Sequence, residues 1–259
     1  MSIQTSHKGG VLRLTLDRPE KSNAFDDQII LDLTEAFLRA AAEPTVRVVV
    51  LAASGKYFSA GGDLSWMQRM AGYSDAENLA DAKALARLMQ AIDLCPKPVL
   101  ARVQGSAFAG AVGLLACCDI VVSVPIAQFA ITEVRLGLIP AVISPYVVRA
   151  IGIRQARRWC LTAERFSAEQ AKTLGLVHEI AEESELDAVL QSQIDALLMA
   201  APSSLAEAKS LLALVDQPLS EQVIDETAHL IARQRASAEG REGVTAFLEK
   251  RTPSWRSRP

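Results

Sequence analysis

Residues 99–119 read VLARVQGSAFAGAVGLLACCD, and the order of residue types in this stretch decides the fold. The mostly apolar residues 99–103 predict a buried strand. Gly105 and Gly110 bound a turn of small residues, and the apolar residues 111–118 after it predict a short helix. A strand, a glycine-marked turn and a helix in direct succession are typical of an α/β protein.

The flanking sequence continues this alternation. Where apolar and β-branched side chains alternate or run together, strands are predicted, at residues 12–16, 46–53, 120–124 and 128–132. Helices are predicted at residues 30–41 and 77–94, and Asp63 is placed to cap a short helix through Met70. From residue 144 onward the pattern is almost entirely helical, with one short strand at residues 176–180. We therefore expect an α/β core followed by a helical segment that covers the core or reaches a neighbouring subunit.

The composition excludes several classes of protein. The 259 residues carry 27 basic and 30 acidic side chains, a net charge of −3, and only 5% are aromatic, which argues against a nucleic-acid partner. No apolar run reaches the length of a membrane span, and residues 1–10 lack the apolar region of a signal peptide, so a cytoplasmic protein is expected. The four cysteines form no CxxC pair and the three histidines are scattered, so no metal site is expected.

The glycines of residues 105–113 do not fit the common phosphate-binding motifs. Gly105 and Gly110 have P-loop spacing, but Ala111 and Val112 stand where the lysine and the hydroxyl residue are required. The gaps also differ from those of a dinucleotide fingerprint. Free N–H groups at the turn of residues 109–110 can instead stabilise negative charge on an oxygen, as can a second turn at residues 60–63. The alternative is that both are tight turns that only allow close packing of strand and helix.

Two carboxylates lie between Gly105 and Pro140, and they differ in surroundings. Asp119 falls at a helix-to-strand junction, where capping or turn hydrogen bonding is expected. Glu133 lies among apolar residues, which predicts a raised pKa suited to a general acid or base; the alternative is an ion pair with Arg135. His178 is interpreted as a structural strand residue.

Five segments, in this order, resemble the enoyl-CoA hydratase/isomerase (crotonase) superfamily over essentially the whole chain. They are residues 14–24 (LTLDRPEKSNA), 46–64 (VRVVVLAASGKYFSAGGDL), 99–119, 128–140 (QFAITEVRLGLIP) and 247–250 (FLEK). The resemblance implies a spiral of β-β-α units in residues 1–195 and a helical trimerisation segment in residues 196–259. It also implies a homotrimer or a hexamer formed as a dimer of trimers, acyl-CoA thioester substrates, no metal, and no cofactor beyond the coenzyme A of the substrate.

The resemblance also assigns site residues. Ala60 and Gly110 correspond to the two N–H donors of an oxyanion hole, and Glu133 to a glutamate that transfers protons. Phe247 and Lys250 match a pair that reaches toward coenzyme A on an adjacent subunit. The full set expected at the substrate is Lys21, Ser22, Ala24, Ala60, Gly61, Gly62, Asp63, Leu64, Trp66, Phe108, Gly113, Phe247 and Lys250.

One position departs from the family pattern. Hydratases of this family usually carry two glutamates, and the first falls at Gly113, which has no side chain; isomerases often keep only the glutamate that matches Glu133. Residues 129–152 and 249–255, however, look like the bacterial 3-methylglutaconyl-CoA hydratases of leucine breakdown and the related isohexenylglutaconyl-CoA hydratases. We therefore expect a hydratase for a branched or glutaconyl-type thioester, with a Δ3,Δ2-enoyl-CoA isomerase as the alternative. Arg135 either pairs with a distal substrate carboxylate or lies exposed at the surface.

Overall fold

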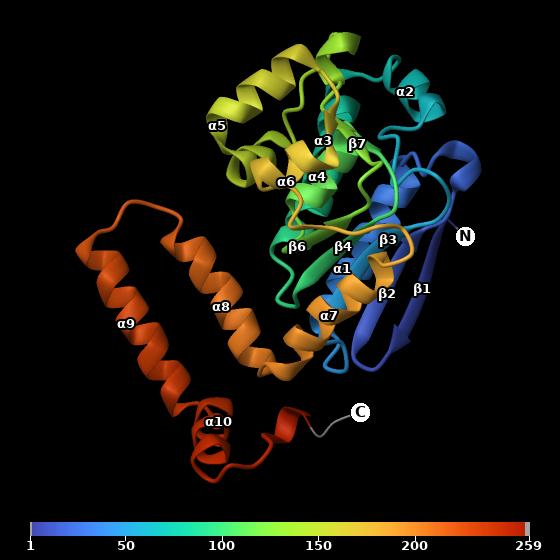
Figure 1. Ribbon diagram of the computed structural model, residues 1–259. Coiled ribbons are helices and arrows are strands. Elements are labelled where there is room, and N and C mark those ends of the chain that lie inside the picture. The colour runs from blue at the N-terminus through green and yellow to red at the C-terminus, as the bar shows by residue number, and fades with distance from the viewer. Residues whose placement is uncertain (1, 257–259) are drawn as a thin grey trace.

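The computed structural model describes residues 2–256, which form two sheets, a set of covering helices and a helical arm (Figure 1). One sheet has six strands in the order β1-β2-β3-β4-β6-β9, and the other has three in the order β5-β7-β8. The strands are β1 (Ile3–Lys8), β2 (Val11–Leu16), β3 (Val48–Ala53), β4 (Val99–Val103), β5 (Ala107–Phe108), β6 (Ile120–Ser123), β7 (Gln128–Ala130), β8 (Phe166–Ser167) and β9 (Glu179–Ile180). The helices are α1 (Asp27–Ala42), α2 (Leu64–Met70), α3 (Asp75–Asp93), α4 (Gly110–Ala116), α5 (Ser144–Thr162), α6 (Ala168–Leu174), α7 (Leu186–Met199), α8 (Pro202–Val215), α9 (Glu221–Ala236) and α10 (Ala238–Leu248), with 3-10 turns η1 (Pro19–Lys21), η2 (Glu133–Leu136) and η3 (Ser254–Arg256).

The larger sheet is parallel from β2 to β9, and its central strands are covered on both faces. All six residues of β3 are buried, as its unbroken apolar sequence predicts. The exposed edge strand β1 pairs antiparallel with β2 and was not predicted, because its residues are largely polar. Gly9 and Gly10 (φ 58° and 78°) form the turn that folds β1 back onto β2.

The smaller sheet contains part of the glycine-marked turn of residues 105–110 and connects it to the loop after β3. Its strand β5 lies inside the stretch predicted as a turn, and a bridge between Ser59 and Ala107 joins it to the loop after β3. The strands predicted at 128–132 and 176–180 shorten to β7 and β9, since only those residues find a partner strand. The remaining predicted strands, and the helical character after residue 144, are confirmed.

Helices α8, α9 and α10 project from the core as an arm, which we call the C-terminal arm (residues 200–256; Figure 1). No residue of α8 is buried. The arm exposes large apolar side chains, namely Leu212, Leu219, Ile224, Ile231, Val244, Phe247 and Leu248. The boundary expected between residues 195 and 196 falls inside α7, because this helix continues to Met199 against the core.

The first and last residues of the C-terminal arm lie together at the end of α7. The indole N–H of Trp255 and Nε of Arg256 both donate to the carbonyl of Met199, at 3.1 and 3.0 Å. From the core, the Arg47 guanidinium donates to the carbonyls of Leu198 (3.2 Å), Ala200 (2.7 Å) and Trp255 (3.4 Å). These cations satisfy the last carbonyls of α7, which a helix end otherwise leaves without partners.

Residues 2–256 contain neither a single helix that could span a membrane nor a cluster of metal-binding side chains. No single helix there is long and apolar enough to cross a membrane; α7 and α8 meet the threshold only together, with a bend of 103° between them. Within the same residues, no group of three or more histidine, cysteine, aspartate or glutamate side chains is arranged to hold a metal ion.

Candidate active site

The two glycine turns identified in the sequence lie side by side. Besides the Ser59–Ala107 bridge, the N–H of Phe108 donates to the carbonyl of Ser59 at 3.0 Å. A Cβ atom on Gly61 would stand 2.9 Å from the carbonyl oxygen of Phe108 and 3.2 Å from Cβ of Ala109. Gly61 also has φ 92°, so both its space and its backbone conformation require glycine.

The expectation that Ala60 donates to an oxyanion is wrong for this structure. The N–H of Ala60 already donates to the carbonyl of Ser22 at 2.9 Å, and that of Gly61 donates to Oγ of Ser59 at 3.2 Å. Within residues 2–256, the N–H groups of Gly62 and Gly110 have no acceptor. The two turns therefore present Gly62 and Gly110, rather than Ala60 and Gly110, as donors for a ligand oxygen.

Gly110 begins α4 in a constrained turn. Ala109, just before it, has φ 50° and ψ −126°, a conformation that costs a non-glycine residue free energy and that occurs most often at functional sites. A Cβ on Gly110 would stand 2.7 Å from Cζ of Phe25, so Phe25 packs against the bare Cα. Phe25 is also bridged to Gly62, which ties the two donor positions to one aromatic ring.

Asn23 fixes the strand-to-helix connection beside these turns. It is buried, and its amide donates to the carbonyls of Ser54 (2.7 Å) and Tyr57 (2.8 Å) while its oxygen accepts from the N–H of Arg18 (2.8 Å). Ser22 and Asn23 both have positive φ, which turns the carbonyl of Ser22 toward Ala60. Sequence analysis placed Ser22 at the substrate but missed Asn23, although a polar residue within a segment that matches the family was a usable signal.

Both carboxylate oxygens of Asp63 are already hydrogen-bonded within the protein, so Asp63 has a structural role and is not available to a ligand. Its Oδ2 accepts from Arg18 and Lys21, each at 3.1 Å, and its Oδ1 caps α2 through the N–H groups of Ser65 and Trp66. Burial raises the pKa of this carboxyl, but the hydrogen bonds from Lys21, Ser65 and Trp66 outweigh burial and hold the pKa below its ordinary value. Lys21 stays half exposed, so its ammonium group is accessible to an anion as well.

The carboxylate of Glu133 is partly buried and has a raised pKa, as a residue that transfers protons requires. It begins η2, directly after the buried strand β7 and Ile131. Burial raises its pKa above the ordinary value of 4.5, although two backbone hydrogen bonds lower it in part. Its Oε2 is buried and has no hydrogen-bond partner within residues 2–256, whereas Arg135 is exposed. The raised pKa expected from the sequence is thus found, and the alternative ion pair with Arg135 is not.

Gly113 lies one turn after Gly110 on α4 and is fully enclosed. A Cβ at this position would stand 2.2 Å from Cγ2 and 2.7 Å from Cβ of Ile143. The space that a side chain at residue 113 would need is therefore filled by an aliphatic side chain from the loop that follows Glu133. Sequence analysis singled out Gly113 but not Ile143.

The other expected substrate residues divide into two groups. Ala24 and Trp66 are buried beside the turns, where the Trp66 indole donates to Asp81 at 3.0 Å, and Phe108 lies under the guanidinium of Arg165 at 5.3 Å. Leu64 is exposed at the start of α2. Phe247 and Lys250 belong to α10 and the turn after it, at the opposite end of the molecule from α2 and α5 (Figure 1). One chain does not bring these two residues to the glycine turns.

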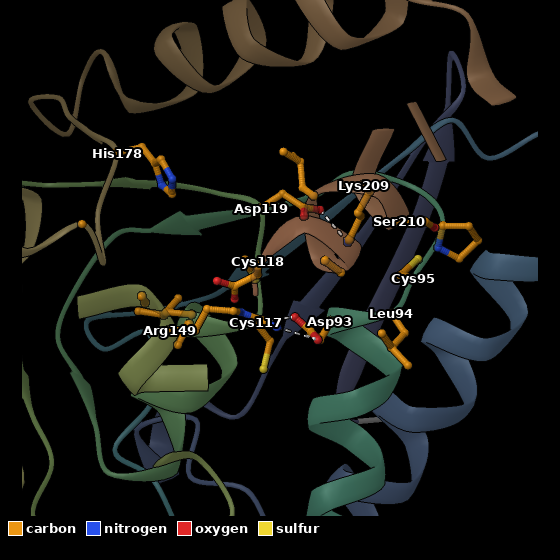
Figure 2. Close-up of a pocket in the computed structure, with 18 of the residues that line it drawn as sticks. Asp93, Leu94, Cys95, Cys117, Cys118, Asp119, Arg149, His178, Lys209 and Ser210 are labelled. Atoms are coloured by element: carbon orange, nitrogen blue, oxygen red, sulfur yellow. Dashed lines mark hydrogen bonds and ion pairs between the residues drawn. The ribbon is translucent and has the colours of Figure 1, made fainter. Parts of the chain in front are cut away.

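A separate cleft of about 610 Å³ lies between α8 and the core, away from Glu133. Figure 2 shows Lys209 of α8 reaching Asp119, at 2.7 Å, and Arg149 paired with Asp93. Asp119 also accepts the N–H of Val99, at the start of β4, at 2.7 Å. Its carboxylate therefore makes a structural hydrogen bond at the strand junction and does not cap a helix. His178 accepts the N–H of Val121 at 3.0 Å, in agreement with its structural interpretation.

Comparisons with known proteins agree with this geometry. The family model described as "Enoyl-CoA hydratase/isomerase" matches residues 6–258. The crystal structure of an enoyl-CoA hydratase from Shewanella pealeana has a TM-score of 0.96 at 46% identity, covering 98% of this chain and 96% of that one. An enoyl-CoA hydratase/isomerase from Marinobacter aquaeolei has a TM-score of 0.93 at 32% identity, covering 98% and 99%. The enoyl-CoA hydratase ACTT6 of Alternaria alternata is 37% identical over 93% of this chain and 79% of its own. This chain is an α/β enzyme of the crotonase fold and belongs to the enoyl-CoA hydratase/isomerase family.

Proposed function

We propose that this protein is an enoyl-CoA hydratase, which adds water across the 2,3 double bond of an acyl-CoA thioester. The observation that carries the proposal is the unpartnered, buried carboxylate oxygen of Glu133, three residues after Ala130. The carbonyl of Ala130 accepts the N–H of Ala109 at 2.8 Å, next to the free N–H of Gly110. Family membership and the names of the relatives support the same reaction class.

The proposed mechanism uses one carboxylate for both proton transfers. Ionised Glu133 takes a proton from water as the water oxygen bonds to C3 of the substrate. The C2–C3 π electrons move to the thioester oxygen, and the N–H groups of Gly62 and Gly110 stabilise that enolate. The enolate then collapses, and C2 takes the proton from the Glu133 carboxylic acid. A carboxyl with a raised pKa suits both halves of this exchange.

We further propose a branched or glutaconyl-type acyl group, as in leucine or terpenoid breakdown. The support is the likeness of residues 129–152 and 249–255 to 3-methylglutaconyl-CoA and isohexenylglutaconyl-CoA hydratases. Arg135, two residues after Glu133, lies exposed, in agreement with the alternative expectation, so no contact with a substrate carboxylate is assigned to it.

A Δ3,Δ2-enoyl-CoA isomerase is the second candidate. The observation that favours it is the enclosed Gly113, which leaves Glu133 as the one carboxylate of the proposed machinery. In that reaction Glu133 takes a proton from C2 and returns it to C4, with no net addition of water.

The oligomer is proposed to form through the C-terminal arm. Its exposed apolar side chains need a partner surface, which supports a homotrimer, or a hexamer as a dimer of trimers. In that assembly, Phe247 and Lys250 of one subunit would contact the coenzyme A bound to the next.

The test is to incubate the protein with crotonyl-CoA, 3-methylglutaconyl-CoA and a 3-enoyl-CoA in turn. Each reaction is monitored by the loss or gain of the absorbance of the 2-enoyl thioester. We expect hydration of the 2-enoyl thioesters, fastest for the glutaconyl one. Glu133→Gln should lower kcat about 10²- to 10⁴-fold while the Kd for a saturated acyl-CoA stays unchanged. Conversion of the 3-enoyl thioester without hydration of the others would decide for the isomerase, and an unimpaired Glu133→Gln enzyme would refute both.

A further inference from the structure

The segment that leads from Glu133 to α5 docks on the core at its far end, around Ile143, with Val142 and Tyr146 packed partly buried beside it. Among residues 132–146, Ile143 is the only buried one, at 3% exposure. Leu136, Leu138 and Ile139 in the same segment are exposed. The position of this segment therefore depends on where Ile143 packs.

Ile143 packs on the bare Cα of Gly113. At 2.2 Å from Cγ2, a Cβ on residue 113 would overlap Ile143, and it would also stand 3.3 Å from Cε of Met89. Gly113 is not among the glycines with positive φ, so its backbone conformation is open to any residue. Glycine at this position is required by the contact with Ile143 and not by the chain geometry.

We infer that Ile143 is a positioning residue: by docking on Gly113 of α4, it fixes the Glu133 carboxyl relative to the Gly110 N–H, one turn earlier on the same helix. This inference rests on the proposed function, because it takes Glu133 as the group that transfers the proton.

Local hydrogen bonds make the two ends of the segment stiff. The N–H of Leu138 donates to the carbonyl of Glu133 at 3.1 Å, and that of Val147 donates to the carbonyl of Ile143 at 3.0 Å. Between them, the N–H of Ser144 donates to the carbonyl of Pro140 at 2.9 Å. Oε2 of Glu133 has no hydrogen-bond partner of its own within residues 2–256. The backbone hydrogen bonds at Glu133 and Thr132 hold the other side of the carboxyl, so the burial of Oε2 depends on the placement of the segment at Ile143.

The kinetic test is a double-mutant cycle of Gly113→Ala and Ile143→Gly. Each single variant should lower kcat about 100-fold, the size expected for a misplacement near 1 Å, with little change in the Kd for a saturated acyl-CoA. In the double variant the losses should not add, because alanine at residue 113 meets no Ile143 side chain. Ile143→Val keeps Cγ2 and should retain wild-type kcat, which guards against a poorly folded glycine variant.

A second measurement does not depend on turnover. The pKa of Glu133 can be followed by carboxyl ¹³C NMR, with the signal assigned by its loss in Glu133→Gln. When Ile143 no longer holds the segment, water should reach the carboxyl and its pKa should fall toward the ordinary value. Cys160, whose pKa is raised by burial and then by the charge of Glu133, should shift in the same direction.

Ile194→Ala on α7 is the matched control. Ile194 is equally buried, at 2% exposure, but lies on α7, which packs against β3, β4 and β6. Its variant should therefore lose stability and keep both kcat and the Glu133 pKa. An unchanged Glu133 pKa in Ile143→Gly, or additive losses in the cycle, would overturn the inference. If the wild type turns over no thioester, the proposed function fails, and the NMR titration still tests Ile143.

Discussion

The charged form of the Glu133 carboxyl lowers the free energy of unfolding, because the folded protein buries this carboxyl. Burial raises its native pKa above 4.5, so the native state holds this proton more tightly than the unfolded chain does. Its contribution to stability is therefore fully present below pH 4.5 and is lost as the pH rises through the native pKa.

We expect Glu133→Gln to be more stable than the wild type at pH 7 and above. Glutamine has no charge to bury, so the difference should shrink as the pH falls and should vanish in acid. Urea unfolding of both proteins across this pH range measures it. A pH-independent difference would mean that the gain comes from packing rather than from the charge.

For single residues, the sequence predicts the chemical environment of a side chain better than the direction of a backbone N–H group. The apolar neighbours of Glu133 predicted a raised pKa, and the structure has it. The choice of Ala60 over Gly62 failed, because the direction of an N–H in an irregular turn depends on a distant acceptor. Here that acceptor is the carbonyl of Ser22, held by the positive φ of Ser22 and Asn23.

Among the elements, helix α2 is capped by the carboxylate of Asp63, which also neutralises two nearby cations. Asp63 accepts two N–H groups of the first turn of α2 and also the side chains of Arg18 and Lys21. The two functions can be separated, because asparagine caps a helix as well as aspartate does but carries no charge.

We expect Asp63→Ala to lose about 1–2 kcal/mol of stability from the missing cap alone. It should lose more from the broken ion pairs with Arg18 and Lys21, although Arg18 keeps its ion pair with Asp26 at 2.8 Å. Asp63→Asn should keep the cap and lose only the charge pairing, so its loss should be smaller. Thermal unfolding ranks the two variants, and equal losses would show that the cap contributes nothing.

The elements that the sequence predicts correctly are those whose burial is set locally. Strand β3 is apolar throughout and needs no knowledge of its neighbours. Strand β1 is polar and exposed, and it forms because the Gly9–Gly10 turn returns it to β2, a pairing that no pattern in residues 3–8 reveals. The short strands β5 and β8 likewise exist only through their partner β7.

For the whole molecule, the C-terminal arm presents apolar surface that the core does not cover. Phe247 is 81% exposed and Leu248 73% exposed, next to each other at the end of α10. If subunits associate through this surface, a charge placed there would be buried without a partner.

We expect Phe247→Asp to weaken self-association, since an unpaired buried carboxylate costs about 3 kcal/mol or more, roughly 100-fold in the association constant. Analytical ultracentrifugation over a range of concentrations measures it. Leu38→Asp, at an exposed leucine of α1, is the control and should leave the assembly unchanged. A wild-type monomer, or an unaffected Phe247→Asp, would contradict the proposed interface.

Because Trp255 and Arg256 return to the carbonyl of Met199, the two ends of the arm lie together at the end of α7. Residues 200–254 can then be exchanged for the equivalent residues of a relative with two junctions at a single point, and no strand of either sheet is rerouted. If subunits associate through the arm, such chimaeras would show whether the assembly surface can be transferred separately from the glycine turns and Glu133 of the core.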